Sequence, residues 1–293
     1  MVKNFEIEKG KMSGDRITYR NLGEIFVIEI EEKNIEVGII EGLPEEYFPD
    51  PFNKYVVIRN LYKYPDRVKA YAEACQYTNC IGATGAAPVI RSYAPMTGVF
   101  AYVVCPALND AFGRKFAPKL ARQADIDIAT FSYYTPQVIE YHKYHEPHID
   151  GESWISLHST RPGTDMKKHI EQGGEIDFKF KSIAGTIYLD ETFGTEIFLN
   201  NNTSHYYSKD SELWGTPPWY KENVGVYPEG SDSCYKPLIK VGGEYNSMAF
   251  YYDIIFHRPN YPDASDEDLK HGRLIQNIWF DDITEDDSPL WKK

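Results

Sequence analysis

Residues 177–201, DFKFKSIAGTIYLDETFGTEIFLNN, contain two short apolar runs separated by an acidic turn that carries a glycine. The first run ends at Tyr188 and Leu189, the second at Phe198 and Leu199, and both are rich in β-branched and aromatic residues. Runs of this length, bounded by Asp, Glu, Gly and Asn, are typical of strands joined by a tight connection. We therefore predict a strand, a turn and a second strand over this stretch.

The sequence on both sides of this stretch contains similar short apolar or alternating runs. Further strands are predicted within ATFSYYTPQVIEYH (129–142), KPLIKVGGEYNSMAFYYDIIF (236–256) and RLIQNIWFDD (273–282). Several short strands with few helices between them favour a β-sandwich or a jelly roll.

The first part of the chain has a mixed pattern. Residues 17–42 alternate in a way that predicts two short strands with a turn near Lys33 and Asn34, and YVVIRN (55–60) predicts another. Pro65 opens a predicted helix, and 108–125 is a second helical candidate interrupted at Pro118. We expect a single domain over residues 1–293, with an α+β lead-in over 1–127 and a β core over 128–285.

A long insert separates two of the predicted core strands, at about residues 201–235. It is rich in Tyr, Trp, Pro and Gly, and it is too long for an ordinary connection. Loops of that length are usually functional lids or disordered segments, and the aromatic content favours a lid.

Composition limits the classes of partner. The formal charge of −13 over 293 residues disfavours phosphate backbones, so we expect no nucleic-acid partner. The N-terminal residues show no apolar stretch of the signal-peptide type, and the longest apolar runs are shorter than the ~20 residues of a membrane span. The four cysteines form no C-x-x-C pair. We expect a cytoplasmic protein without membrane contact.

The segment YHKYHEPHIDGESW (141–154) contains the pair His148 and Asp150, spaced H-x-D. Two residues apart on an extended strand, their side chains emerge on one face and can hold one cation. Two imidazoles and one carboxylate form the facial triad of non-haem iron(II). The third ligand that we favour is His257, at the end of the apolar stretch NSMAFYYDIIFH; its main rival, His271, lies in a polar segment. The other downstream histidines are His158, His169 and His205.

Arg273 begins the last predicted strand. A buried guanidinium there could bind a dicarboxylate through two hydrogen bonds, which lysine does less well. Arg258 is the rival choice, and a surface arginine at the start of a strand is the structural alternative.

The order of these motifs resembles the 2-oxoglutarate/iron(II)-dependent dioxygenases: H-x-D, a late strand ending in His, and Arg at the start of a final aromatic strand. AGTIYLDETFGTEIFLN is similar to the strand–turn–strand of prolyl-hydroxylase-like members, and YNSMAFYYDIIFH is similar to a later strand of that group. YVVIRNLYKYPDRVKAYA resembles the opening of a poorly characterised bacterial and phage branch.

This resemblance implies a mainly β protein with flanking helices (α+β) and a double-stranded β-helix (jelly roll, cupin-like) core. His148, Asp150 and His257 would bind iron, and Arg273 would bind the distal carboxylate of 2-oxoglutarate. The spacing of 16 residues between His257 and Arg273 is longer than is usual in the family, and position 275 is Ile where a Ser or Thr is expected. A hydroxyl partner for Arg273 must then come from elsewhere, and the candidates are Tyr188, Thr186 and Tyr141.

The implied activity is hydroxylation of an unactivated C–H bond with release of succinate and CO2. It uses Fe(II), 2-oxoglutarate and O2, with ascorbate as an optional reductant. A carboxylate ligand at Asp150 favours hydroxylation over halogenation. The substrate would be an amino acid-like small molecule or a protein side chain, with Tyr141, Trp154 and Trp219 as candidate contacts. Two alternatives stay open: a cupin-like metalloenzyme that does not use 2-oxoglutarate, and a non-enzymatic β-sandwich binding or structural module. The sequence leaves the oligomeric state open.

Overall fold

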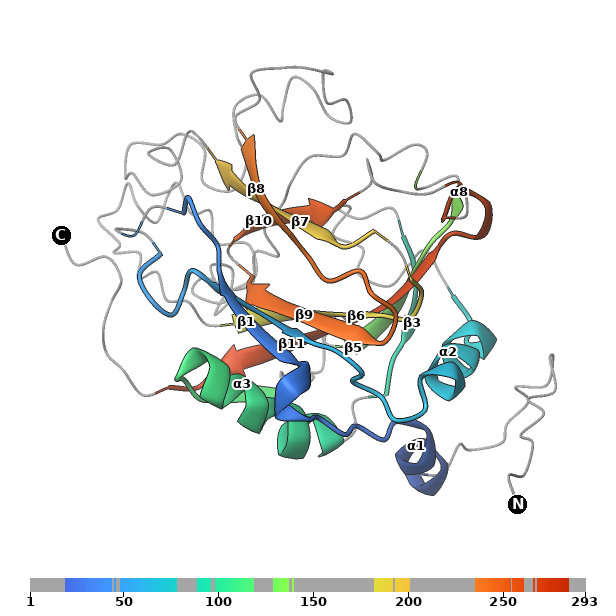
Figure 1. Cartoon of the computed structure of the whole chain (residues 1–293). Coiled ribbons are helices and arrows are strands. Elements are labelled where there is room, and N and C mark those ends of the chain that lie inside the picture. The colour runs from blue at the N-terminus through green and yellow to red at the C-terminus, as the bar shows by residue number, and fades with distance from the viewer. Residues whose placement is uncertain are drawn as a thin grey trace, which may run out of the picture.

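Two antiparallel sheets form the body of the computed structural model (Figure 1). It describes residues 19–43, 45, 48–77, 89–95, 98–118, 129–136, 139, 182–191, 193–200, 235–253, 255–260, 266 and 268–284. Over these residues the large sheet has the order β1-β2-β9-β6-β11-β5-β3, with β4 also paired to β11, and the small sheet has the order β10-β7-β8. The large sheet consists of β1 (Ile35–Ile39), β2 (Lys54–Ile58), β3 (Ile90–Tyr93), β4 (Phe116–Pro118), β5 (Ala129–Tyr134), β6 (Ser182–Tyr188), β9 (Ser247–Tyr252) and β11 (Arg273–Asp282). The small sheet consists of β7 (Thr195–Asn200), β8 (Tyr235–Val241) and β10 (Phe256–Pro259).

The helices of the first part of the chain and the small sheet lie on opposite sides of the large sheet (Figure 1). The helical elements are α1 (Tyr19–Ile25), the 3-10 turn η1 (Glu32–Asn34), α2 (Pro65–Ala74), the π-helix η2 (Phe100–Val104), α3 (Cys105–Phe112) and the short α8 (Asp268–His271). In the part of the chain that the structure describes, no helix has both the length and the apolar character needed to cross a bilayer.

The path of the core strands is that of a double-stranded β-helix. From β6 in the large sheet the chain crosses to β7 and β8 in the small sheet, returns to β9, crosses to β10 and returns to β11. Strands that are neighbours in a sheet are therefore mostly distant in sequence: β11 lies between β6 and β5, and β7 lies between β10 and β8. This topology confirms the predicted jelly-roll core.

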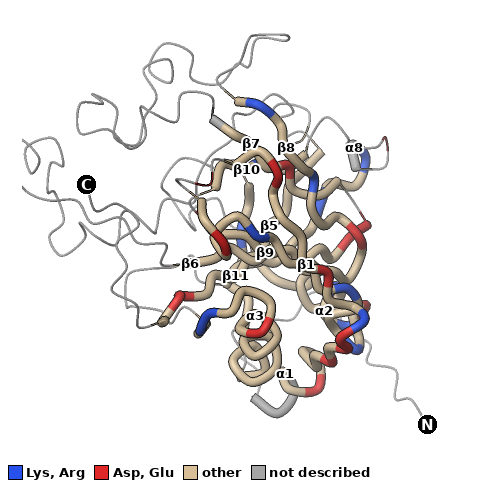
Figure 2. The backbone as a smooth tube through the Cα atoms, turned by 60° about the vertical axis from the view of Figure 1, so that its left-hand side comes forward, with Lys and Arg blue, Asp and Glu red and all other residues tan. Residues whose placement is uncertain are grey.

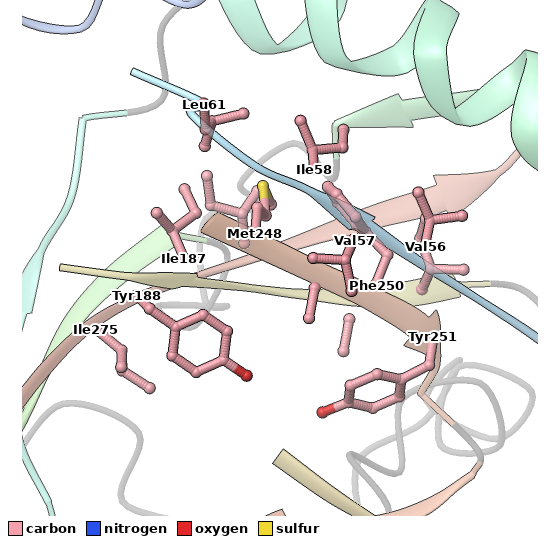
Figure 3. Close-up of a cluster of buried hydrophobic side chains, with 14 of the residues drawn as sticks. Val56, Val57, Ile58, Leu61, Ile187, Tyr188, Met248, Phe250, Tyr251 and Ile275 are labelled. Carbon is pink, nitrogen blue, oxygen red and sulfur yellow. The ribbon is translucent and has the colours of Figure 1, made fainter. Parts of the chain in front are cut away.

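The two faces of the large sheet differ in chemistry. Figure 3 shows Ile58, Ile187 and Met248 on one side of the strands, and Tyr188 and Tyr251 on the other. The first side belongs to a continuous apolar core that also includes residues of α2 and α3, and burial of each such side chain contributes about 1.5–3 kcal/mol. The second side faces the small sheet and carries many polar or small residues. They include Thr130, Ser132, Ala184, Thr186, Ser247, Ala249 and Asn277.

Two predicted elements of the lead-in are wrong. The first half of 17–42 forms helix α1 and not a strand, because Leu22, Ile25 and Phe26 present one helical face to the core. The helix predicted over 108–125 ends at Phe112, since Gly113 takes a left-handed φ of 67°. Residues Phe116–Pro118 instead pair with β11 as an edge strand, where proline is tolerated.

The apolar stretch NSMAFYYDIIFH, predicted as one strand, is two strands in different sheets. The chain turns after Tyr252, where the Ile255 N–H donates to the Tyr252 carbonyl at 2.9 Å. The buried carboxylate of Asp253 accepts a hydrogen bond from the Ser182 hydroxyl. The break transfers His257 to β10 in the small sheet.

Candidate active site

Arg273 is the largest fully buried side chain among the residues that the structure describes, with 1% of its surface exposed. Its guanidinium carbon lies 4.5 Å from the ring centroid of Phe193, 5.3 Å from that of Tyr188 and 5.4 Å from that of Tyr134. Its Nε and Nη1 atoms have no hydrogen-bond partner within the described part of the chain. Leaving charged donors unpaired in a buried site is costly, so these atoms point to an anionic ligand.

Arg273 is the first residue of β11, and it lies near the C-terminal end of β6 in the large sheet. Arg273 pairs with Tyr134 of β5, and the preceding Gly272 has a φ of 77°. A Cβ atom at Gly272 would lie 2.4 Å from the carbonyl oxygen of Tyr134, so only glycine allows this approach. Arg273 therefore begins the strand, as predicted, with its side chain on the face toward the small sheet.

Tyr188, a predicted hydroxyl partner of Arg273, forms one wall of its surroundings. Its hydroxyl lies 2.9 Å from the Thr195 hydroxyl and donates to the Val241 carbonyl at 3.3 Å. Burial raises the pKa of Tyr188, although the charge of Arg273 and the hydrogen bond to Thr195 oppose the shift. The phenol is therefore neutral at ordinary pH, and it contributes a ring face and a hydroxyl rather than a second charge.

Thr186, the other described hydroxyl candidate, lies farther along the same face. Its hydroxyl donates to the Asn277 side-chain oxygen at 3.3 Å, and the Asn277 amide donates to the Ser132 hydroxyl at 3.2 Å. Thr186 thus belongs to a short polar chain across β6, β11 and β5.

Sequence reasoning missed several of these residues. Tyr134, Phe193, Ser132 and Asn277 all face the interior near Arg273 or Thr186. The available signal was the alternation within β5 and β11, which puts every second residue on one face. The cross-strand register that brings Tyr134 beside Arg273 is not encoded locally.

His257 is buried on β10, with 5% of its surface exposed. Its Nδ1 lies 2.9 Å from the Ile255 carbonyl oxygen, and its ring centroid lies 4.8 Å from that of Tyr251, on the inward face of β9. A carbonyl only accepts, so Nδ1 is the donor in this contact. Metal-ligating histidines are commonly oriented in this way, so His257 fits the predicted role.

Strand β7 relates His257 to the surroundings of Arg273. His257 pairs with Ile197, and the Tyr188 hydroxyl beside Arg273 reaches Thr195. Thr195 and Ile197 are two residues apart on one face of β7, a separation of about 7 Å. The inward face of β7 therefore borders both regions.

The rival residues lie elsewhere. Arg258 is on the outward face of β10, where its Nη2 donates to the Glu196 carboxylate at 3.1 Å and its guanidinium stacks on Phe198. His271 is exposed at the end of α8, and its carbonyl accepts a hydrogen bond from the Tyr133 hydroxyl. Neither lies on the face that carries Arg273.

The remaining predicted site residues lie outside the described ranges. They are His148, Asp150, Tyr141, Trp154 and Trp219. Among the residues that the structure describes, no group of three His, Cys, Asp or Glu side chains could hold a metal ion. The metal triad and the substrate contacts therefore stay predictions.

Comparison with known proteins gives distant structural similarities. No protein-family profile and no curated protein sequence matches the chain. HygX from Streptomyces hygroscopicus, solved with nickel, 2-oxoglutarate and hygromycin B, matches with a TM-score of 0.39 at 11% identity, over 81% of this chain and 85% of HygX. An N-substituted L-amino acid dioxygenase from Burkholderia ambifaria AMMD matches with a TM-score of 0.36 at 11% identity, over 77% of this chain and 81% of that enzyme. Similarities this weak support no inference about the activity of this chain.

Proposed function

We propose that this protein is an Fe(II)/2-oxoglutarate-dependent oxygenase that hydroxylates an unactivated C–H bond of an amino acid-like small molecule or a protein side chain. The observation that carries the proposal is the buried Arg273 guanidinium, two of whose nitrogen atoms have no partner among the described residues. A planar guanidinium matches a carboxylate through two parallel hydrogen bonds. The distal carboxylate of 2-oxoglutarate is the group that would complete this site.

The surroundings of Arg273 suit a bound carboxylate. The rings of Phe193, Tyr188 and Tyr134 exclude water, which strengthens a charge-assisted hydrogen bond. The neutral Tyr188 phenol brings no competing negative charge. A cupin-like enzyme without 2-oxoglutarate, or a structural module, has no use for such an arginine, and this favours the oxygenase over both alternatives.

His257 would hold the metal together with His148 and Asp150. The Ile255 carbonyl fixes the orientation of the imidazole through Nδ1, an arrangement that is common for metal-ligating histidines. When bound, the iron and 2-oxoglutarate would supply the oxidising chemistry, with uptake of O2 and release of succinate and CO2. The contribution of the chain is to bind the co-substrate at Arg273, to orient the metal ligands and to exclude bulk water.

The direct test is anaerobic addition of Fe(II) and 2-oxoglutarate to the purified protein. A weak visible charge-transfer band is expected for the wild type, and it should be lost in Arg273→Met and in His257→Ala. Arg258→Met is the matched control, because it removes an arginine from the outward face of the same region. Absence of the band in the wild type, together with no binding of 2-oxoglutarate by calorimetry, would reject the proposal.

The substrate class requires an aerobic screen. Succinate release should be stimulated by one member of a library of amino acids, peptides and nucleosides. Stimulation by a free amino acid would support a small-molecule substrate, and stimulation by peptides alone would support a protein side chain.

A further inference from the structure

The start of β11 is held by a side chain that follows β6. Asp190 lies two residues after Tyr188, and its Oδ2 atom accepts the backbone N–H of Leu274 at 2.8 Å. Its Oδ1 atom accepts from Lys69 Nζ of α2 at 2.5 Å. One carboxylate therefore joins a helix to the residue that follows Arg273.

The hydrogen bond between Asp190 and Leu274 lies just beyond the end of the β6–β11 pairing. The pairing of β6 with β11 begins at Tyr188 and Ile275, and Arg273 precedes that pair. Beyond the pair of Tyr188 and Ile275, the Leu189 N–H donates to the Leu274 carbonyl at 3.2 Å, and the Asp190 carboxylate accepts a hydrogen bond from the Leu274 N–H. On the β6 side, Asp190 is the side chain that fixes the backbone next to Arg273.

The pair of Lys69 and Asp190 lies on the opposite face of the sheet from the Arg273 side chain. It lines a cavity of about 670 Å³ that is also lined by Glu73, Tyr133 and Leu274. Charged residues of both signs gather on and around α2 (Figure 2). Burial works against the charge of Lys69, but the hydrogen bond and charge of Asp190 outweigh it and raise the pKa of the lysine. The lysine therefore keeps its positive charge at neutral pH.

We propose that Asp190 is a positioning residue for Arg273, and that its bond to Lys69 transmits the position of α2 to the co-substrate site. The inference rests on the proposed function, because it concerns how tightly Arg273 binds a distal carboxylate. Bidentate binding needs the guanidinium to be held to within about 0.5 Å. Asp190 touches no ligand itself and acts only through the backbone of Leu274.

The test compares two ligands on metal-loaded protein under anaerobic conditions. 2-Oxoglutarate has a distal carboxylate, and 2-oxopentanoate has a methyl group in its place. Asp190→Ala should weaken 2-oxoglutarate binding by about tenfold or more, equivalent to one lost charge-assisted hydrogen bond, while 2-oxopentanoate binding stays unchanged. Lys69→Met should give a smaller selective loss, about threefold.

Lys63→Met is the matched control, because Lys63 and Glu29 form a similar ion pair at the surface. It should leave both dissociation constants unchanged. If Asp190→Ala does not fold, Asp190→Asn tests the link to Lys69, because it keeps an acceptor for Leu274 and loses the charge facing Lys69. It should give the same selective loss as Lys69→Met, about threefold, and an unchanged affinity would overturn the inference.

The outcomes separate the two proposals. Equal weakening of both ligands would show general disruption and overturn the inference. Unchanged 2-oxoglutarate binding in the Asp190 variants, with normal binding by the wild type, would overturn the inference alone. Failure of the wild type to bind 2-oxoglutarate would overturn the proposed function and the inference with it.

Discussion

Replacing Arg273 with methionine should have little effect on folding and a large effect on ligand binding. The two nitrogen donors of Arg273 that have no partner in the described ranges each cost about 1–3 kcal/mol while they stay unpaired. The three aromatic rings around the guanidinium return roughly 0.5–2 kcal/mol each. These contributions nearly cancel, and methionine fills a similar volume. We therefore expect the free energy of unfolding of Arg273→Met to lie within about 2 kcal/mol of the wild type.

Binding should respond differently, because the ligand is what satisfies those donors. Two charge-assisted hydrogen bonds at about 1.5–3 kcal/mol each amount to about 3–6 kcal/mol, or a 10²- to 10⁴-fold loss of 2-oxoglutarate affinity. Thermal unfolding with and without metal and 2-oxoglutarate measures both quantities at once. At 100 times the wild-type dissociation constant the ligand should stabilise the wild type by about 2.7 kcal/mol and Arg273→Met by no more than about 0.4 kcal/mol.

Arg258→Met provides the contrast. This substitution leaves Glu196 without its partner in a largely buried pair, so it should destabilise the protein by about 3 kcal/mol and keep the stabilisation by 2-oxoglutarate. Two results would refute the reasoning about Arg273: equal stabilisation of Arg273→Met by the ligand, or a loss of more than about 4 kcal/mol without ligand. The second result would mean that the fold itself satisfies the charge.

Three further predictions follow from single contacts. Gly272→Ala should lower the free energy of unfolding by about 3 kcal/mol, and Gly113→Ala by only about 1 kcal/mol. Both glycines have a positive φ, but only at Gly272 would the new Cβ meet a backbone atom, at 2.4 Å. Chemical denaturation of the two variants measures the difference. Burial raises the pKa of Tyr62 well above its usual value, so the folded state keeps this proton when the unfolded state loses it above about pH 10. Stability should therefore fall as pH rises through that range, and Tyr62→Phe should make the slope shallower by about 1.4 kcal/mol per pH unit in urea titrations. His257→Ala should abolish binding of Fe(II) by calorimetry, whereas His271→Ala should bind as the wild type does; equal retention in both would exclude His257 as a ligand.

The strands of the core could be predicted from sequence because each is a short apolar or alternating run between turn residues. Arg273 and His257 could be singled out for the same reason, since each is an ionisable residue at the edge of an apolar run. The local pattern left a surface position open for Arg273, and the structure shows that both residues are buried.

The rest depends on contacts between distant segments. The break between β9 and β10 needs Asp253 to meet Ser182 of β6, which no local pattern specifies. The aromatic surroundings of Arg273 depend on the register of β11 against β5, which brings Tyr134 beside it. Asp190 looked like an ordinary turn residue, and its role depends on Lys69 of a helix that precedes it by 121 residues.

Side chains along β11 alternate between two faces of the large sheet, one that packs on the helices and one that faces the small sheet. Leu274, Gln276, Ile278 and Phe280 face the helices, where a change of volume or polarity affects whether the chain folds. Their neighbours Ile275, Asn277 and Trp279 lie on the other face, toward the small sheet. Because Ile275 and Trp279 still pack on the core cluster, a library that keeps apolar residues at positions 275 and 279 and varies position 277 should yield mostly folded proteins, which makes β11 a place where ligand preference can change while the scaffold is retained.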